Sequence, residues 1–515
     1  MATFGAVLLA ILAFAGGSSA AKILVISPTA SFSHQLPFHI VTKALLERGH
    51  RVTLMTTDSP KINHENYTEV DLSISYKHMR GDYDFVKMSQ EPPTETVKML
   101  RDFPRASIEL QMSDPQVQKF VSSGEKFDLV IFERLGYLAY YGLIQRVGAP
   151  PAVAFITLSP PSSIYHGFGN PMNPAYMPDM WLGYSDHMDF WQRLYNTYFY
   201  LRLMYMWFYD LMPAQEQLMH KYFGSDLPPI YEMERNFSLL IINNHFCMEY
   251  PRPHLPNIIE LTGIHVATEQ KPLPKDVKKF LDEAEHGVIY FSLGSNVRSN
   301  SLPDWKRQAF VEAFRELPQR VLWKWESDTL PDQPANLMVS KWLPQQDVLA
   351  HPKVRVFISQ GGLQSLNEAA YHAVPLLVVP FFSDQAHNAA KVQQAQVGLW
   401  LEYADVTKDA LLRDLRAILQ DSKYKENMNR LSAVFREHKA DSVERAVWWI
   451  EYVLRHKGAP HLRSAALDLH WWQLLLLDVV AFVLAVAAAT AAALYLLARR
   501  LFSGLSAWRV KTKVA

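Results

Sequence analysis

The chain has 515 residues, of which 49% are hydrophobic, and its 51 Lys and Arg residues balance 51 Asp and Glu residues. This length suits two or three domains of about 150 residues each, and the apolar share can fill a large core. Because the charges balance, the chain lacks the basic surface typical of nucleic-acid binding, and we expect no nucleic-acid partner. The single cysteine, Cys247, excludes an intrachain disulfide, and we expect a small buried hydrophobe rather than a nucleophile.

The first segment is a short apolar run from Ala6 to Ala15, followed by small residues up to Ala20. Ser18 and Ala20 occupy the positions that a signal peptidase requires, so we predict a cleaved secretory signal peptide over residues 1–20. A buried strand or a membrane anchor is the alternative. The run is too short to span a bilayer, and a separate strand pattern opens at Lys22.

The next segment predicts a β-α-β unit and therefore a parallel sheet. A strand is expected at 22–27, a loop at 28–33, a helix at 35–48 and a second strand at 51–57. Further strands are expected at 127–133, 152–158 and 237–243. We assign residues 21–262 to an N-terminal domain.

The segment from Tyr176 to Met212 is dense in Trp, Tyr, Phe and Met, partly at helical spacing. One interpretation is an amphipathic helix that closes the core. The other is an apolar wall for a lipophilic substrate, or a surface that touches a membrane. The sequence leaves both open.

A Pro-rich stretch at 251–256 precedes a second alternation of strands and helices, which we assign to a C-terminal domain at 263–460. Strands are expected at 288–293, 321–325, 338–342, 354–359 and 376–381, and helices at 304–316, 363–372, 423–438 and 442–455. The fold class is therefore α/β, with two such domains in series. Ligands of such sheets bind at the carboxyl ends of the strands, here between the domains.

The last segment predicts a single membrane crossing. The run from Val479 to Ala498 carries no charge and, at about 20 residues, is long enough for one bilayer. We assign residues 471–498, which begin with two interfacial tryptophans, to a transmembrane helix and 499–515 to a basic cytosolic tail. A buried soluble helix is the alternative.

Two features refine this localisation. Lys511 and Lys513 stand near the C-terminus at the spacing of a dilysine retrieval signal, although a generic basic flank is the alternative. We expect a single-pass type I protein of the endoplasmic reticulum membrane, in contact with lipid, with its body in the lumen. The sequons at Asn66 and Asn236 fit a lumenal body and are predicted glycosylation sites.

The loop after the strand at 354–359 predicts an anion site. It begins Gln360-Gly361-Gly362, and glycines let the backbone approach a ligand closely. The helix that follows offers unpaired N–H groups and a positive dipole end to a phosphate. Gln364 and Ser365 can add hydrogen bonds. A Gly-Gly pair alone is equally compatible with an ordinary strand-to-helix turn.

Neighbouring strand ends favour a nucleotide sugar as the ligand. Trp342 closes a predicted strand and can stack on a planar base, whose edge Gln345 can contact. Glu368 suits a ribose diol. Asp384 and Gln385, at the end of the next strand, can hold sugar hydroxyls. The short loop at Gly294-Ser295 faces the same expected cleft.

The run from Trp342 to Asn388, together with SFSH, SLGSN and the terminal anchor, closely resembles the family 1 UDP-glycosyltransferases over the whole chain. The variant QGGLQS is similar to the insect branch. The resemblance implies a GT-B fold, with two Rossmann-like domains that face a cleft, plus one C-terminal transmembrane helix. It implies that the N-terminal domain, 21–262, binds the acceptor and that the C-terminal domain, 263–460, binds the UDP-sugar. It also implies a UDP-sugar donor, and we expect no metal cofactor.

The resemblance also implies roles for the residues of the run. Trp342 and Gln345 would contact uracil, and Glu368 the ribose. The diphosphate would lie against the loop and its serines, and the sugar against the next strand end; these residues are Ser295, Gly362, Gln364, Ser365, Asp384 and Gln385. Gln360 departs from the pattern, because most of the family has His there. A neutral amide can donate a hydrogen bond but carries no charge, so we expect altered donor affinity.

Transfer of a sugar to a hydroxyl needs a base, and neutral His suits that work near pH 7. His34 follows the first strand, and the resemblance implies that its SHxxP pattern carries the base. The family pairs this His with an Asp, for which the chain has Glu133. A carboxylate there fixes the imidazole tautomer and stabilises the imidazolium. A structural His and a surface carboxylate are the alternatives.

Donor and acceptor follow less directly. Relatives that use glucuronic acid tend to carry Arg at the position of Asn243, which offers no charge to a sugar carboxylate; we predict UDP-glucose and inversion at the anomeric carbon. Small lipophilic acceptors are expected: phenols, plant toxins, pigments and steroids. A UDP-sugar-binding pseudoenzyme or a regulatory partner of active relatives is the alternative function. A homo- or hetero-oligomer is also conceivable.

Overall fold

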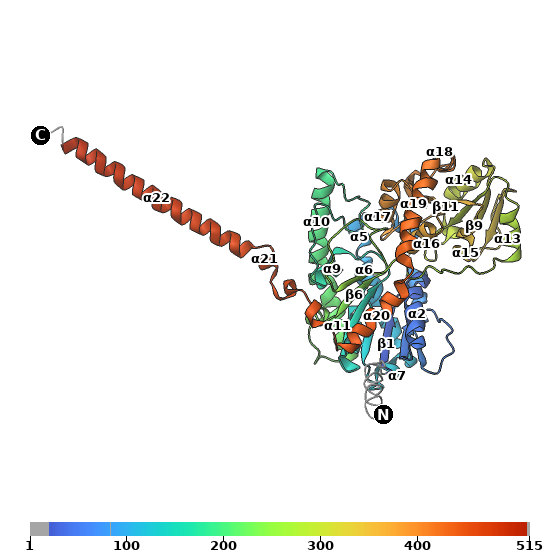
Figure 1. The fold of residues 1–515 in the computed structure, drawn as a ribbon, viewed down its shortest axis with the longest axis horizontal. Coiled ribbons are helices and arrows are strands. Elements are labelled where there is room, and N and C mark those ends of the chain that lie inside the picture. Colours follow the sequence, from blue (N-terminus) through green and yellow to red (C-terminus); the bar gives the residue numbers. More distant parts are fainter. Residues whose placement is uncertain (1–19, 83, 512–515) are drawn as a thin grey trace, which may run out of the picture. The chain divides into compact units, whose positions relative to one another are not determined.

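The computed structural model describes residues 20–82 and 84–511. The predicted signal peptide at 1–20, apart from Ala20, and the second lysine of the predicted retrieval signal, Lys513, lie outside the described residues. The chain divides into two compact units, one ending at Arg463 and the other beginning at Ser464. The first unit holds two parallel sheets in the described residues (Figure 1).

The first sheet has seven strands in the order β3-β2-β1-β4-β5-β6-β7. Every neighbouring pair is parallel, which confirms the predicted sheet. Hydrophobic side chains fill both of its faces, as a parallel sheet covered by helices requires. Its strands are β1 Lys22–Ser27, β2 Arg51–Thr56, β3 Tyr67–Asp71, β4 Leu129–Glu133, β5 Ala152–Ile156, β6 Leu239–Ile242 and β7 Ile258–Glu260.

The second sheet has six parallel strands in the order β10-β9-β8-β11-β12-β13. It too is packed with apolar side chains on both faces. The strands are β8 Val288–Ser292, β9 Arg320–Lys324, β10 Leu337–Ser340, β11 Val354–Ser359, β12 Leu376–Val378 and β13 Gly398–Trp400. We call each sheet with the helices packed on it a lobe, N-terminal and C-terminal. The boundary predicted after residue 262 falls between β7 and β8 and stays a prediction.

Helices cover both faces of each sheet (Figure 1). Those from the N-terminal part of the chain are α2 Phe32–Glu47, α3 Tyr76–Asp82, α4 Phe85–Met88, α5 Pro93–Thr96, α6 Met99–Ser113, α7 Pro115–Val121, α8 Tyr141–Arg146, α9 Ser162–Gly167, α10 Phe190–Met206, α11 Met212–Phe223 and α12 Ile230–Glu234. Those from the C-terminal part are α13 Lys275–Asp282, α14 Asp304–Arg315, α15 Gln345–Leu349, α16 Leu363–Tyr371, α17 Gln385–Gln394, α18 Lys408–Gln420, α19 Ser422–Lys439 and α20 Ser442–Arg455.

The helix α20 belongs to the core of the N-terminal lobe although it follows the second sheet in sequence. Figure 1 shows it, in orange, beside the blue α2. Its buried Val447 and Ile450 join the apolar cluster of the first sheet, and Arg48 forms an ion pair with Glu444. The chain therefore crosses between the lobes a second time, which ties them together at α20.

The aromatic segment that the sequence left open forms α10 and, directly after it, a π-helical turn, Trp207–Leu211. The side chains of Phe199, Leu203 and Trp207 are buried in the core of the N-terminal lobe. Because these residues recur every four positions, the helix closes the core with one face. The opposite face stays exposed, with Trp191 at 72%.

In the second unit, one helix, α22 Leu477–Lys511, contains a candidate membrane span, Leu477–Ser503. By length and composition alone it can cross a membrane, since 27 residues of helix span about 40 Å. It follows a short helix, α21 Trp471–Leu474, which contains the two tryptophans predicted to flank the membrane.

Candidate active site

A cleft of about 830 Å³ is lined by both lobes. Its walls are the residues that follow the carboxyl ends of strands in each sheet, where parallel α/β sheets bind ligands. All the predicted catalytic and UDP-sugar residues line it except Glu133, which lies buried behind His34: His34, Ser295, Trp342, Gln345, Gln360, Gly362, Gln364, Ser365, Glu368, Asp384 and Gln385. The structure thus brings together residues from distant parts of the sequence.

His34 and Glu133 are in direct contact. His34 Nδ1 lies 2.8 Å from Glu133 Oε1. The helix α2 begins at Phe32, before the predicted start at Gln35, so His34 stands in its first turn. With the Nδ1 proton directed at the carboxylate, the other ring nitrogen, Nε2, is left free to accept a proton.

Glu133 is held in place from several sides. Its side chain is 1% exposed at the end of β4. Its second oxygen, Oε2, accepts hydrogen bonds from the Thr29 amide at 3.2 Å and from Ser27 Oγ at 3.4 Å. Thr157 Oγ1 lies 3.0 Å from His34 Nδ1, the same ring nitrogen that contacts Glu133. A buried, hydrogen-bonded carboxylate can orient an imidazole and stabilise its cation.

The loop between β11 and α16 has the backbone shape expected of an anion site. Gly361 has φ +90°, and a Cβ atom there would meet Val378 at 2.6 Å, so only glycine fits. Gly362 caps α16 with no side chain, which leaves the amides of the first turn directed at the cleft. Gln360 is buried, and Ser359 Oγ donates to its Oε1 at 3.2 Å.

Glu368 is a buried carboxylate that two amides hold. Gln345 Nε2 donates to one oxygen at 2.6 Å and Gln346 Nε2 to the other at 3.0 Å. Burial raises the pKa of Glu368 to about 7, and the two amides only partly offset the effect. Gln345 also donates to Ser365 Oγ at 2.9 Å. An acceptor poised in this way suits a pair of ribose hydroxyls.

Trp342 lies beyond the end of β10 and not inside a strand, because the chain turns where Ser340 Oγ donates to the Trp342 carbonyl at 3.0 Å. Its side chain is 60% exposed, which leaves a ring face open to a ligand. The Phe32 ring meets it edge-on, with centroids 5.6 Å apart. Lys324 Nζ lies 5.9 Å from the ring centroid.

Asp384 and Gln385 stand at the start of α17. Asp384 is buried, and Asn388 Nδ2 donates to its Oδ2 at 2.9 Å. Burial raises the pKa of Asp384, against the opposing effects of Asn388, Lys391 and His34. The side-chain oxygen of Gln385, Oε1, accepts from the Phe381 and Phe382 backbone amides, so the side-chain NH₂ group remains for a ligand.

One predicted diphosphate residue, Gln364, also joins the lobes, and a second contact between the lobes lies beside Ser295. Gln364 Nε2 donates to the Ser33 carbonyl, and Ser31 Oγ donates to Asn296 Oδ1 at 3.1 Å. Ser295 lines the cleft next to Asn296. Gln364 is therefore engaged with the start of α2, beside His34, and its contact with the diphosphate stays a prediction.

Sequence reasoning missed three residues of the cleft. Lys324, at the end of β9, donates to the Gly294 carbonyl at 2.9 Å and brings a cation beside the Gly294-Ser295 loop. Gln346 holds Glu368, and Thr157 contacts His34. A signal existed for Lys324 and Thr157, since each stands at or just after the carboxyl end of a parallel strand.

Other predicted sites lie away from the cleft. Asn236 is exposed between α12 and β6, and Asn66 is half-buried before β3. Burial raises the pKa of the Cys247 thiol to about 12, so this residue is not poised as a nucleophile. Across residues 20–82 and 84–511 no three His, Cys, Asp or Glu side chains gather as a metal site.

Solved structures share this architecture. CalG4, the calicheamicin glycosyltransferase, superimposes with a TM-score of 0.57 at 18% identity, covering 85% of this chain and 99% of its own. A UDP-glucosyltransferase from Polygonum tinctorium gives a TM-score of 0.55 at 16% identity, covering 84% and 98%. The fold is that of the GT-B glycosyltransferases, two parallel α/β lobes around a cleft, as the sequence predicts.

Relatives in sequence narrow the class. UDP-glucosyltransferase 2 of Dactylopius coccus is 39% identical over 91% of this chain and 90% of its own length. Human UDP-glucuronosyltransferase 1A3 is 31% identical over 93% and 91%. Residues 21–505 match the sequence model of the family described as "UDP-glucoronosyl and UDP-glucosyl transferase". The chain belongs to that family. It is a UDP-glycosyltransferase, which uses a UDP-sugar donor and binds an acceptor.

Proposed function

We propose that the protein transfers glucose from UDP-glucose to a hydroxyl of small lipophilic acceptors, with inversion at the anomeric carbon. The observation that carries this proposal is the His34–Glu133 contact in the same cleft as the start of α16. A proton acceptor and an anion site thus face one space, as a single displacement requires. The retained pair gives no reason to prefer a binding-only role.

In this mechanism the acceptor hydroxyl gives its proton to His34 Nε2 while its oxygen bonds to the anomeric carbon. The bond from that carbon to the UDP oxygen breaks, and UDP leaves as an anion. Glu133 stabilises the imidazolium that forms. The amides at the start of α16, with Ser365 and Lys324, stabilise the charge that develops on the diphosphate.

The remaining ligand groups follow the strand ends. Trp342 stacks on uracil, Gln345 contacts its edge and Glu368 binds the ribose diol. Asp384 and Gln385 bind hydroxyls of the sugar. Gln360 donates a neutral hydrogen bond to the diphosphate. Gln364 contacts the diphosphate and also fixes the first turn of α2 through its hydrogen bond to Ser33.

Glucose is proposed because the chain offers no cation for a sugar carboxylate at Asn243. This residue is fully buried, and its Oδ1 accepts from the Ile264 amide at 2.9 Å. Its Nδ2 lies 3.2 Å from His265 Nδ1. Burial lowers the pKa of His265 to about 4, so that imidazole is neutral as well. The insect relative at 39% identity is named for glucose transfer.

The setting proposed for this activity is the endoplasmic reticulum membrane, with the body lumenal, α22 spanning the bilayer and the sequons at Asn66 and Asn236 glycosylated. Acceptors that partition into lipid suit an anchored enzyme. Phenols, plant toxins, pigments and steroids are the proposed classes, and conjugation of such compounds the proposed role.

The test uses membranes that contain the full chain, a panel of phenols and steroids, and labelled UDP-glucose, UDP-galactose and UDP-glucuronate. We expect transfer from UDP-glucose, a β-linked product, and little or none from UDP-glucuronate. Preference for the acidic donor would refute the donor assignment, and an α-linked product would refute inversion.

A further inference from the structure

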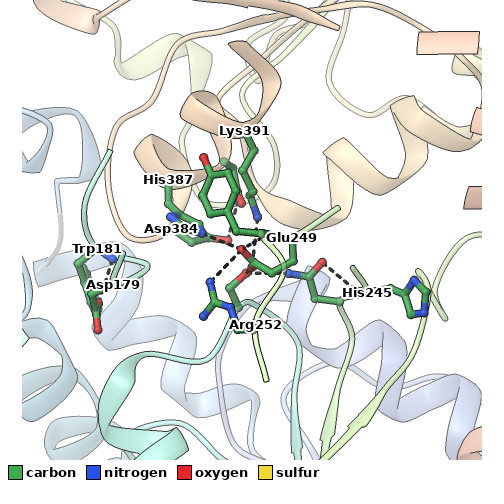
Figure 2. A network of polar contacts seen from close by, with 12 residues as sticks. Asp179, Trp181, His245, Glu249, Arg252, Asp384, His387 and Lys391 are labelled. Carbon is green, nitrogen blue, oxygen red and sulfur yellow. Dashed lines mark hydrogen bonds and ion pairs between the residues drawn. The ribbon is translucent and has the colours of Figure 1, made fainter. Parts of the chain in front are cut away.

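A buried carboxylate outside the described cleft receives hydrogen bonds from both lobes. Glu249 lies in the loop that follows β6, and its side chain is 5% exposed. Figure 2 shows it at the centre of a polar network, with α17 above it and the loops of the N-terminal lobe below. Glu249 is not among the residues that the family resemblance assigns to catalysis or donor binding.

The donors from the N-terminal lobe fix the carboxylate tightly. Ser159 Oγ donates at 2.5 Å and Asn244 Nδ2 at 2.9 Å, both to Oε2. Arg252 Nη2 donates to Oε1 at 3.2 Å. Ser159 follows β5 closely, next to the Thr157 that contacts His34. This side of the network is therefore built on the strand end, that of β5, from which Thr157 contacts the proposed base.

The donors from the C-terminal lobe come from α17. His387 Nε2 lies 3.1 Å from Glu249 Oε1, and Lys391 Nζ lies 3.4 Å from Oε2. Burial disfavours the Glu249 anion, but Lys391, Arg252 and His387 outweigh it and hold its pKa well below the usual range. The ionised carboxylate of Glu249, in the N-terminal lobe, thus binds one face of α17 in the C-terminal lobe.

The face of α17 that Glu249 binds is the face that begins with Asp384. His387 and Lys391 stand three and seven positions after Asp384, so all three side chains lie on one side of the helix. Lys391 also acts electrostatically on Asp384. Asn388 ties Asp384 to the glycine loop, because it donates to the Gly361 carbonyl at 2.9 Å.

We propose that Glu249 is a positioning residue, which holds the sugar-contacting first turn of α17 in register with His34 by binding His387 and Lys391 across the two lobes. This inference rests on the proposed function, since it concerns the alignment of donor sugar and base. UDP itself binds to groups of the C-terminal lobe, so Glu249 governs the sugar end of the donor and not the nucleotide.

Stability alone gives a weak reason for such a network. Burying several charges costs desolvation that their attraction often only balances, and apolar side chains of similar volume stabilise a core as well or better. Directional contacts from two lobes to one carboxylate do what apolar packing cannot, which is to fix a helix at one rotation and height. A shift of about 1 Å in such an alignment lowers turnover by about 100-fold.

The experiment compares Glu249→Gln, Lys391→Met and the double variant in the full-length membrane protein. Glu451→Gln is the matched control. Glu451 is also a buried carboxylate beside basic side chains, with His50 Nε2 at 3.4 Å and Arg455 Nη1 at 3.6 Å, but it lies on α20 and does not line the cleft. Turnover, donor KM, the UDP dissociation constant and the melting temperature are measured for each.

We expect kcat to fall about 10- to 100-fold in Glu249→Gln and in Lys391→Met. UDP affinity should stay within about twofold, as for sites that share no partner. The double variant leaves fewer unpaired charges, so its melting temperature should exceed that of the worse single variant while kcat stays low. Glu451→Gln should lower the melting temperature and keep kcat.

Two outcomes would overturn the proposal: unchanged kcat in Glu249→Gln, or a loss of UDP affinity that parallels the loss of kcat. A wild-type protein that transfers no sugar would instead refute the proposed function. In that case the positioning role is tested by ligand-induced stabilisation, measured as the rise in melting temperature with UDP-glucose minus the rise with UDP. Loss of this increment in Glu249→Gln supports the positioning role, and its persistence overturns it.

Discussion

The two lobes contribute to the cleft in different ways. In the N-terminal lobe, two residues 99 positions apart in sequence meet at 2.8 Å, and nearly every contact around them fixes one imidazole. In the C-terminal lobe, many residues between Trp342 and Gln385 each offer one group to a ligand. The first arrangement suits chemistry and the second suits affinity. Single substitutions in the two lobes should therefore have different effects. Those in the N-terminal lobe should lower turnover, and those in the C-terminal lobe should weaken donor binding.

The carboxylates of the two lobes make the same contrast. Glu133 contacts an imidazole, a hydroxyl and an amide, and it has a base to stabilise. Glu368 meets only the neutral amides of Gln345 and Gln346 in the described chain, and burial raises its pKa to about 7. A carboxylate with so little compensation is held ready for a ligand that supplies the missing donors.

The largest effect is expected for His34→Ala. Removing the base should lower kcat by about 1,000-fold or more, because general-base catalysis contributes 10²–10⁴-fold. UDP affinity should not change, since no UDP contact is proposed for His34. Isothermal calorimetry with UDP, beside a turnover assay, checks both statements.

The control for this variant is His39→Ala, on the same helix. His39 Nε2 lies 3.2 Å from Thr56 Oγ1, and His39 does not line the cleft. It should retain turnover. Normal turnover in His34→Ala would remove the N-terminal lobe from the chemistry and erase the contrast between the lobes.

The two halves of the site also differ in how well the sequence predicts them. The donor side lies in one stretch of chain, where strand ends, glycines and a tryptophan recur in order, and both sheets were predicted from the alternation of strands and helices. The pairing of His34 with Glu133 depends on β1 and β4 being neighbours, which local periodicity cannot reveal. It was accessible only through the resemblance to a family.

Other contacts could not have been predicted because they cross the lobes. Gln364 was expected at a phosphate and donates to Ser33, while α20 returns to the first sheet after the second is complete. The sequence places the start of α2 at Gln35, whereas the helix begins at Phe32 after Ser31, whose side chain makes no capping hydrogen bond. Such contacts are set by docking of surfaces far apart in sequence, where no local spacing applies.

The second prediction concerns the base-stacking surface of the C-terminal lobe. Trp342→Ala should weaken UDP binding by about 10-fold, because stacking of a base on an aromatic ring contributes 1–3 kcal/mol. With saturating donor, kcat should fall much less, and Trp342→Phe should recover most of the affinity. Calorimetry with UDP provides the measurement.

Trp305→Ala serves as the control, because Trp305 and Trp342 are each 60% exposed and only Trp342 lines the cleft. If Trp342→Ala lowered kcat and left UDP affinity intact, donor binding would not be confined to the C-terminal lobe as proposed.

The third prediction follows from the raised pKa of Glu368. In the ligand-free protein the folded-state pKa is about 7 against an ordinary 4.5, so the stabilising contribution is complete below pH 4.5 and is lost as the pH rises through 7. The variant Glu368→Gln should therefore gain stability relative to wild type between pH 5 and pH 8, by roughly 3 kcal/mol at most. Urea unfolding at several pH values measures this gain.

Ligand binding should show the opposite sign. The ribose diol donates to the carboxylate, so wild-type affinity should weaken by up to about 10-fold from pH 8 to pH 6 as Glu368 takes up a proton. Uridine is the ligand to use, because it lacks phosphates that titrate in the same range. Glu368→Gln should bind uridine weakly at both pH values, and an equal pH response in both proteins would exclude Glu368 as the ribose acceptor.

The smallest effect is expected at Gln360, the position at which the family resemblance leads us to expect His. The variant Gln360→His should tighten UDP binding by about 3- to 5-fold at pH 6, because a hydrogen bond from a cation to phosphate contributes about 1 kcal/mol more than one from a neutral amide. At pH 8 the imidazole is neutral and the gain should vanish. Gln360→Asn, which keeps a neutral amide, should show no gain at either pH. A gain that persists at pH 8 would mean that shape, and not charge, distinguishes glutamine from histidine here. Shape is a real alternative because Gln360 Nε2 is closely packed: a Cβ atom on Gly294 would approach it to 2.2 Å.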